Sequence, residues 1–192
     1  NKVVLWGENC PEWLVALWGC LLSETIVVPI DFRASTKFVD RVIDIVNATA
    51  LVVGNDLRLP VKFPPSKIVS LNTLLRDTPS TKIVFNKYKR SRSKNSEPRL
   101  AEIIFTSGAT AEPKGVQLTH KNILANIIPV EQEILKYKSY SRLVSPIRFL
   151  NLLPLSHMFG QAMSTFIPPM LTGTTVFMRG YNPEDIVSQI RK

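Results

Sequence analysis

Residues 105–116 read Phe-Thr-Ser-Gly-Ala-Thr-Ala-Glu-Pro-Lys-Gly-Val and follow a short apolar run. Such a loop can bring backbone N–H groups and hydroxyls close to a polyphosphate. Gly108 permits a close backbone approach, because it has no Cβ. Ser107 and Thr110 can donate to phosphate oxygens, and Lys114 adds a compact positive charge. The stretch indicates a phosphate-binding loop, and a surface turn without a ligand is the alternative.

This loop differs from the P-loop of nucleoside triphosphatases. The P-loop pattern places Gly-Lys-Ser/Thr at the start of a helix. Here the lysine lies between Pro113 and Gly115, and no Ser or Thr follows it. An ordinary P-loop enzyme is therefore disfavoured.

The chain on both sides of the loop alternates short apolar runs with helical patterns. Ser35 and Thr119 are predicted helix N-caps, Asn9 is a further candidate cap, and Phe38, Val42, Ile45 and Val46 are expected on one helix face. The expected strands cover residues 3–6, 25–29, 51–53, 67–71, 100–105, 149–153 and 174–178, with a loop over 106–115. The expected helices cover residues 12–22, 36–47, 119–128, 157–167 (ended by Pro168-Pro169) and a last one opened by Asn182-Pro183-Glu184. This order predicts the α/β class, with largely parallel sheets flanked by helices.

Length and composition fit a globular chain with a hydrophobic core. Of its 192 residues, 45% are hydrophobic and 20% are charged. The longest apolar run covers residues 13–22, about half of what a membrane span needs. Cys10 and Cys20 lack metal or redox spacing and are expected to be small core residues in a reducing compartment. The chain starts without Met and stops in a helical pattern, so we expect it to be part of something longer.

Positive charge is concentrated in one segment. The formal net charge is +9, and residues 82–99 carry seven basic side chains against one acid, Glu97. We expect residues 87–99 to be a flexible basic loop between a first portion, 1–86, and a second, 100–192. Peripheral contact with an anionic membrane is the alternative role. Nucleic acid binding is not expected, because no recognition pattern accompanies the charge.

The loop, with the Gln-Leu-Thr-His-Lys-Asn that follows it, resembles the phosphate-binding signature of the adenylate-forming (AMP-binding) superfamily. That superfamily comprises acyl-CoA synthetases, adenylation domains of peptide synthetases and luciferases. Its usual form is aromatic-Thr-Ser-Gly-Ser/Thr-Thr-Gly-x-Pro-Lys-Gly-Val, and ten of the twelve positions fit. Ala109 removes one hydroxyl and Ala111 restricts the backbone. Ser107, Thr110 and Lys114 remain, so phosphate binding is expected to survive.

A second motif, Pro-Leu-Ser-His-Met-Phe-Gly at residues 154–160, resembles the next superfamily motif in the form of long-chain fatty acyl members. The resemblance implies that His157, Phe159 and Gly160 belong to the acyl and carboxylate pocket. A lone histidine without such a motif is more often structural. Residues 4–13 and 27–31 resemble the superfamily's early strand-turn-helix and following strand, which gives the four motifs the expected order.

The resemblance implies ATP-dependent activation of a carboxylic acid, foremost a fatty acid, to an acyl-adenylate, followed by transfer to CoA or a carrier protein. Magnesium would assist, and a cytoplasmic location is expected. The implied ATP phosphate-binding residues are Thr106, Ser107, Gly108, Ala109, Thr110 and Lys114.

The family's magnesium-binding acid, ribose-binding aspartate and catalytic lysine are expected beyond Lys192. The chain would then be an incomplete N-terminal domain without metal ligands or the C-terminal domain, and inactive alone. An amino-acid or aryl-acid adenylation domain and a non-catalytic nucleotide-binding protein are the alternatives.

Overall fold

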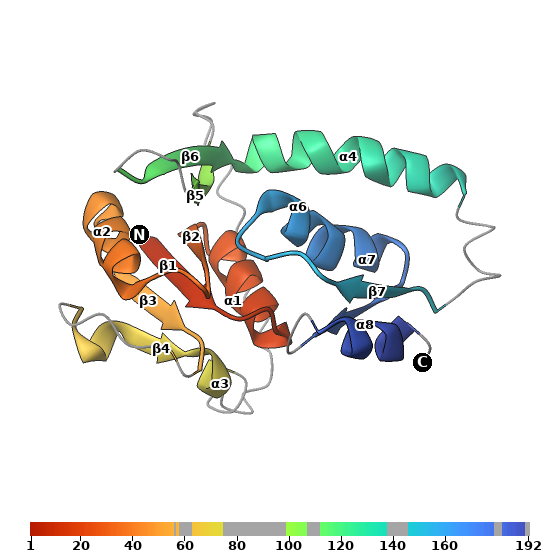
Figure 1. Ribbon diagram of the computed structural model, residues 1–192. Coiled ribbons are helices and arrows are strands. Elements are labelled where there is room, and N and C mark those ends of the chain that lie inside the picture. The colour runs from red at the N-terminus through yellow and green to blue at the C-terminus, as the bar shows by residue number, and fades with distance from the viewer. Residues whose placement is uncertain are drawn as a thin grey trace, which may run out of the picture.

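The computed structural model describes residues 1–55, 57, 63–74, 99–106, 112–137, 146–178 and 182–190. The described residues form a six-stranded sheet and a two-stranded sheet. The long helix α4 (His120–Lys136) extends from the edge of the larger sheet past the helices that accompany the smaller one (Figure 1). The predictions for Ser107, Gly108, Ala109 and Thr110, and those for the basic residues 82–98, lie outside the described residues.

The first sheet has the strand order β4-β3-β1-β2-β5-β6. Its strands are β1 (Lys2–Gly7), β2 (Ile26–Asp31), β3 (Ala50–Val53), β4 (Ile68–Ser70), β5 (Leu100–Thr106) and β6 (Lys114–Thr119). Every neighbouring pair is parallel except β5 and β6, which are antiparallel. The predicted α/β fold with a largely parallel sheet is confirmed.

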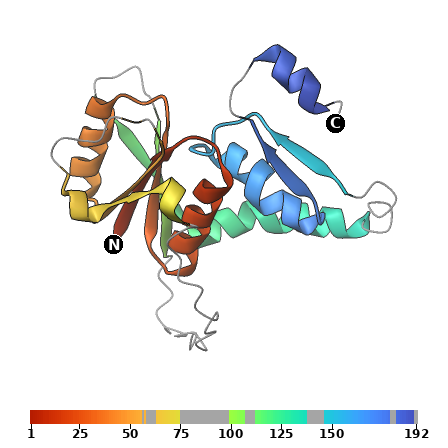
Figure 2. The ribbon, with the colours of Figure 1, turned by 90° about the horizontal axis from the view of Figure 1, so that it is seen from below.

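Helices cover both faces of this sheet, as Figure 2 shows. Val4 and Trp6 of β1 belong to the core on the side of α2 (Thr36–Val46). Leu5, between them, belongs to the core on the side of α1 (Pro11–Leu22) and the short α3 (Leu71–Leu74). Alternation along the strand sends successive side chains to opposite faces, and burial of each large apolar side chain contributes about 1.5–3 kcal/mol.

Helix α2 confirms its predicted cap but not the whole of its predicted face. Ser35 Oγ accepts from the Phe38 N–H at 3.3 Å. Ile45, placed on the buried face by the sequence reading, is 57% exposed. The buried residues are Val39, Val42, Ile43 and Val46. These follow the i, i+3, i+4, i+7 spacing of a helix face, which Ile45 does not fit.

Strand β6 was not predicted. The sequence reading continued the loop to Gly115 and began the next helix at Thr119, whereas Lys114–Thr119 pairs with β5. Its residues are mostly exposed, so the strand lacks the apolar run that marks the buried ones. The sheet-edge position explains the missing signal.

Helix α4 begins as predicted and runs further. Thr119 and Asn122 form a reciprocal capping box, which fixes the start. The helix continues through Pro129 to Lys136, beyond the predicted end near residue 128. Pro129 removes one backbone hydrogen bond, but good helix formers and a Glu133–Lys136 ion pair at 2.7 Å follow it.

The second sheet pairs β7 (Arg148–Asn151) in parallel with β8 (Thr174–Phe177). Between them lie α6 (Met158–Gln161), a π-helical turn (Ala162–Phe166) and α7 (Ile167–Met170). Pro168 and Pro169 were expected to end the helix, but they lie within α7, the last part of an unbroken helical run that begins at Met158. Asn182 Oδ1 accepts from the Glu184 N–H at 3.2 Å and opens α8 (Pro183–Ile190) as predicted.

Candidate active site

Polar residues gather where the parallel strands of the first sheet end. Glu8 follows β1, Asp31 ends β2, Asn55 lies beyond β3 and Thr106 ends β5. The connection after β1 leads to α1 on one face, and that after β2 leads to α2 on the other. In open α/β sheets, ligands bind at the carboxyl ends of neighbouring strands whose connections diverge in this way, so we expect a ligand at this edge.

The predicted phosphate loop leaves the sheet at this edge. Thr106 and Lys114 are partners in the antiparallel ladder of β5 and β6, and theirs is the last pair of the ladder before the chain enters the predicted loop. Lys114 is exposed. The structure therefore brings together the two described members of the predicted phosphate-binding set.

Gly115 is explained by packing within the hairpin. A Cβ at this position would lie 2.8 Å from Ile103 Cγ2 and 3.1 Å from Phe105 Cζ. Both neighbours are buried in the core on the α2 side. A larger residue would push β6 away from β5 and would move Lys114 with it.

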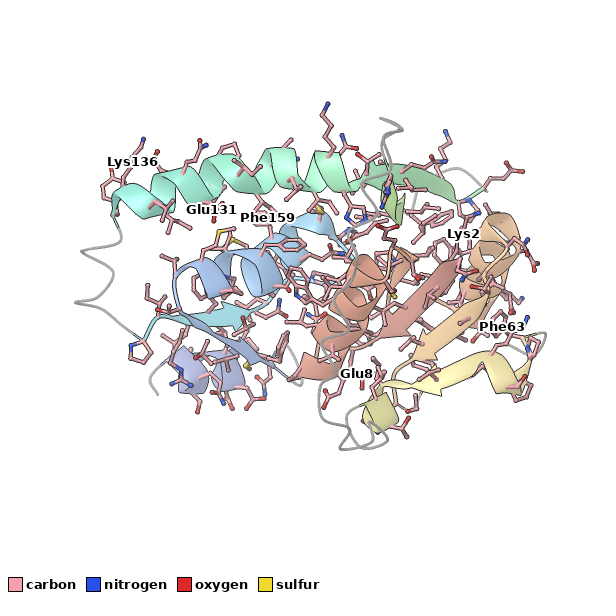
Figure 3. All side chains as sticks on the ribbon, turned by 180° about the vertical axis from the view of Figure 1, so that it is seen from behind. Lys2, Glu8, Phe63, Glu131, Lys136 and Phe159 are labelled. Atoms are coloured by element: carbon pink, nitrogen blue, oxygen red, sulfur yellow. The ribbon has the colours of Figure 1, made fainter. Side chains whose placement is uncertain are left out.

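The predicted acyl-pocket residues differ in their surroundings. His157 precedes α6 and is exposed, and Phe159, labelled on α6 in Figure 3, is 66% exposed. Gly160 is buried, and a Cβ there would collide with the Pro154 carbonyl oxygen. Gly160 therefore permits close backbone packing, while His157 and Phe159 are free to contact a ligand.

Asp31 and Arg33 form a charged pair at the end of β2 that sequence reasoning did not include in the site. Arg33 Nε and Nη2 donate to the Asp31 carboxylate, each at 2.8 Å. This hydrogen bonding is the main reason the pKa of Asp31 is lowered, and the nearby His157 adds a smaller effect. His157 is thus close to the carboxyl end of β2, and an acid followed two residues later by Arg is the only sequence signal.

Asn9 does not cap α1, contrary to the sequence prediction. Cys10 is the N-cap residue and makes no side-chain capping hydrogen bond, while Pro11 occupies the first turn as predicted. The Asn9 side chain instead reaches the end of β7 and the segment that follows it, with hydrogen bonds to Asn151, Leu153 and Leu155. Such a long-range contact has no signature in the local sequence.

Glu102 and Gln161 form a buried pair between β5 and α6. Both are 0% exposed, and Gln161 Nε2 donates to Glu102 Oε2 at 3.1 Å. Burial raises the pKa of the Glu102 carboxyl from 4.5 to about 7, an effect that the hydrogen bond from Gln161 partly opposes. Within the part of the chain that the structure describes, the other oxygens, Glu102 Oε1 and Gln161 Oε1, have no hydrogen-bond partner. A protonated carboxyl could donate to a flipped Gln161 amide.

The two cysteines are half-buried beside the core near α1. Burial raises the pKa of the Cys10 thiol to about 12 and that of Cys20 to about 11, so neither is a thiolate nucleophile at neutral pH. Among the described residues, no three His, Cys, Asp or Glu side chains are grouped to hold a metal ion. None of the described helices is long and apolar enough to cross a membrane.

The model of the AMP-binding enzyme family matches residues 1–192, so the chain belongs to this family. It is 29% identical over 199 residues to a long-chain-fatty-acid–CoA ligase of Rattus norvegicus, covering 92% of this chain and 29% of the ligase. It is 25% identical over 197 residues to tyrocidine synthase 3 of Brevibacillus parabrevis, covering 99% of this chain and 3% of that protein.

A solved structure with the same fold is that of the O-succinylbenzoate CoA synthetase of Bacillus subtilis in complex with ATP and magnesium. It aligns with a TM-score of 0.68 at 18% identity, over 100% of this chain and 47% of the synthetase. The chain therefore spans under a third of the rat ligase and about half of this structure.

The Glu102 pKa predicts a pH dependence of stability. The folded-state pKa is raised, so the contribution of this group is fully present below about pH 4.5 and is lost as pH rises to about 7. Glu102→Gln cannot ionise, so it should raise the free energy of unfolding by about 3 kcal/mol near pH 8 and by less than about 1 kcal/mol near pH 5. Urea unfolding at both pH values measures this. An equal effect at both would contradict a raised pKa.

Gly160→Ala should destabilise the chain by at least about 2 kcal/mol, because its Cβ would meet the Pro154 carbonyl, a backbone group that cannot rotate away. Gly19→Ala is the matched control. Gly19 lies inside α1 with nothing within 4 Å of its would-be Cβ, so alanine there should stabilise by up to about 1 kcal/mol. Thermal unfolding of the two variants compares them, and a loss at Gly19 equal to that at Gly160 would refute this reading of the contact.

Proposed function

We propose that the chain forms the front part of an ATP-dependent acid–thiol ligase. This enzyme would activate a carboxylic acid as an acyl-adenylate and transfer the acyl group to a thiol. The observation that carries the proposal is the Thr106–Lys114 pair, which closes the Ser/Thr/Gly-rich loop at the carboxyl edge of a parallel sheet near the His157 segment. Membership of the AMP-binding enzyme family supports it.

Lys114 fits a site for an anionic polyphosphate. It is exposed at the start of β6, where its ammonium group can approach phosphate oxygens. We infer that Lys114, Thr106 and the loop hydroxyls of Ser107 and Thr110 hold the outer phosphates of ATP. In the proposed reaction a carboxylate attacks the α-phosphate and pyrophosphate leaves, so this set would stabilise charge on the leaving group.

The acid is proposed to be a fatty acid. The motif around His157 has the fatty acyl form, and Phe159 offers an exposed aromatic surface next to it. The fatty-acid relative supports this choice. An amino-acid substrate is the second candidate, favoured by the similarity to tyrocidine synthase 3.

The remaining parts of the machinery are proposed to lie outside these residues. We propose that the ribose-binding, magnesium-binding and catalytic groups follow Lys192, since the chain covers only 29% of the rat ligase. CoA or a carrier protein would be the thiol acceptor. A cytoplasmic location, and a peripheral membrane contact through the basic residues 82–99, are also proposals.

The test is carboxylate-dependent exchange between pyrophosphate and ATP, measured on the longer protein that carries this chain with fatty, aryl and amino acids. We expect exchange with fatty acids. Lys114→Ala should reduce it about ten- to a hundredfold, because a charged phosphate contact is lost.

Lys136→Ala is the matched control. Lys136 is also exposed but lies at the far end of α4, as Figure 3 shows, so its replacement should leave exchange within about twofold. Exchange with no acid would reject the enzyme proposal. Unchanged exchange in a folded Lys114→Ala variant would reject only the phosphate-binding role of Lys114, and the enzyme proposal would stand.

A further inference from the structure

One asparagine side chain joins two parts of the site that are far apart in sequence. Asn9 Nδ2 donates to Asn151 Oδ1 at 2.7 Å and to the Leu153 carbonyl at 2.9 Å. Asn9 Oδ1 accepts from the Leu155 N–H at 3.0 Å, across 146 residues. The amide thus uses both donors and its acceptor on a single short segment.

The two backbone contacts of Asn9 bracket Pro154. Proline has no N–H, so the turn cannot be held by a donor at residue 154 itself. The Pro154 carbonyl accepts from the His157 N–H at 3.2 Å and is the group that a Cβ on Gly160 would strike. The position of Pro154 therefore sets the start of α6 and the place of His157.

A second asparagine, Asn151, holds the same segment. We call the side-chain hydrogen bonds of Asn9 and Asn151 to residues 153–155 the asparagine clamp, or the clamp. Asn151 Nδ2 donates to the Leu153 carbonyl at 3.1 Å and also to Ser164 Oγ. Asn151 and Ser164 are 5% and 2% exposed. Both asparagine amides are then satisfied, and loss of either one leaves a largely buried polar group without its partner.

Apolar burial alone does not explain this arrangement. The Leu155 side chain is 1% exposed and packs in the core with Trp13 and Leu17 of α1. That contact holds the segment against the sheet, but it is non-directional. The hydrogen bonds of Asn9 supply the direction, because they fix the peptide groups on both sides of Pro154.

We propose that Asn9 is a positioning residue for the acid substrate, holding the 153–155 turn so that His157 and Phe159 face the acid. This inference rests on the proposed function of the His157 segment. None of the described hydrogen bonds of Asn9 reaches the β5–β6 hairpin that carries Lys114. Replacement of Asn9 should therefore raise the KM for the acid and leave the KM for ATP nearly unchanged.

The first test needs no activity and is made in the longer protein that carries this chain. Asn9→Ala should speed hydrogen exchange of the Leu155 amide and of peptides covering residues 151–160 by about tenfold, because the bonds that protect them are lost. Peptides from β1 and β5 should change by less than about twofold. Unchanged exchange at Leu155, or an equal rise throughout the chain, would overturn the clamp.

The second test measures kinetics in the longer protein. Asn9→Asp keeps the acceptor, removes both donors and sets a carboxylate against the Leu153 carbonyl and Asn151 Oδ1. The KM for the acid should rise about tenfold while the KM for ATP stays within about twofold. Asn126→Asp is the control, because Asn126 is exposed on α4 and its side chain donates to the Asn122 carbonyl of the same helix at 2.9 Å.

If Asn9→Asp does not fold, the two KM values are compared in Asn9→Gln instead. Glutamine keeps the amide group but moves it away by one methylene, so the three hydrogen bonds cannot all form. Equal rises in both KM values, or a fall in kcat alone, would contradict the proposal that Asn9 positions the acid-binding segment. A wild-type protein that activates no acid would reject the proposed function, and hydrogen exchange would still decide the clamp.

Discussion

The hydrogen bonding of the Asn9 amide is the constraint on which the candidate site depends. The phosphate loop leaves the first sheet, whereas His157 belongs to the segment that leads from the second. Asn9 ties the exit of β1 to that segment, and the buried Glu102–Gln161 pair ties β5 to α6. Apolar packing brings the first sheet and the His157 segment together, and these directional hydrogen bonds fix their relative position.

The electrostatics of the site follow from this arrangement. Lys114 provides an exposed positive charge at the loop, and Asp31 is neutralised by Arg33. Glu102, behind the site, has a pKa near neutrality, so its negative charge is weakened where it would oppose an anionic ligand. A polyphosphate and a carboxylate are both anionic, and Lys114 is the exposed cation that the described start of β6 offers them.

Much of the fold could be predicted from local patterns. Buried parallel strands read as apolar runs, and Ser35 and Thr119 mark helix starts by chemistry that acts within three residues. The phosphate loop and the His157 motif could be found by resemblance, although residues 107–111 of the loop lie outside the described residues. The failures have physical causes: β6 is an exposed edge strand, Ile45 was assigned to the wrong helix face, and Asn9 makes contacts that no local pattern encodes.

A double-mutant cycle between Asn9 and Asn151 tests the central claim most directly. The free energy of unfolding would be measured for wild type, Asn9→Ala, Asn151→Ala and the double variant by urea denaturation. If the two amides form one clamp, their effects are non-additive, with a coupling of at least about 1 kcal/mol. Additive losses, within about 0.3 kcal/mol, would contradict the clamp and with it the positioning of the His157 segment.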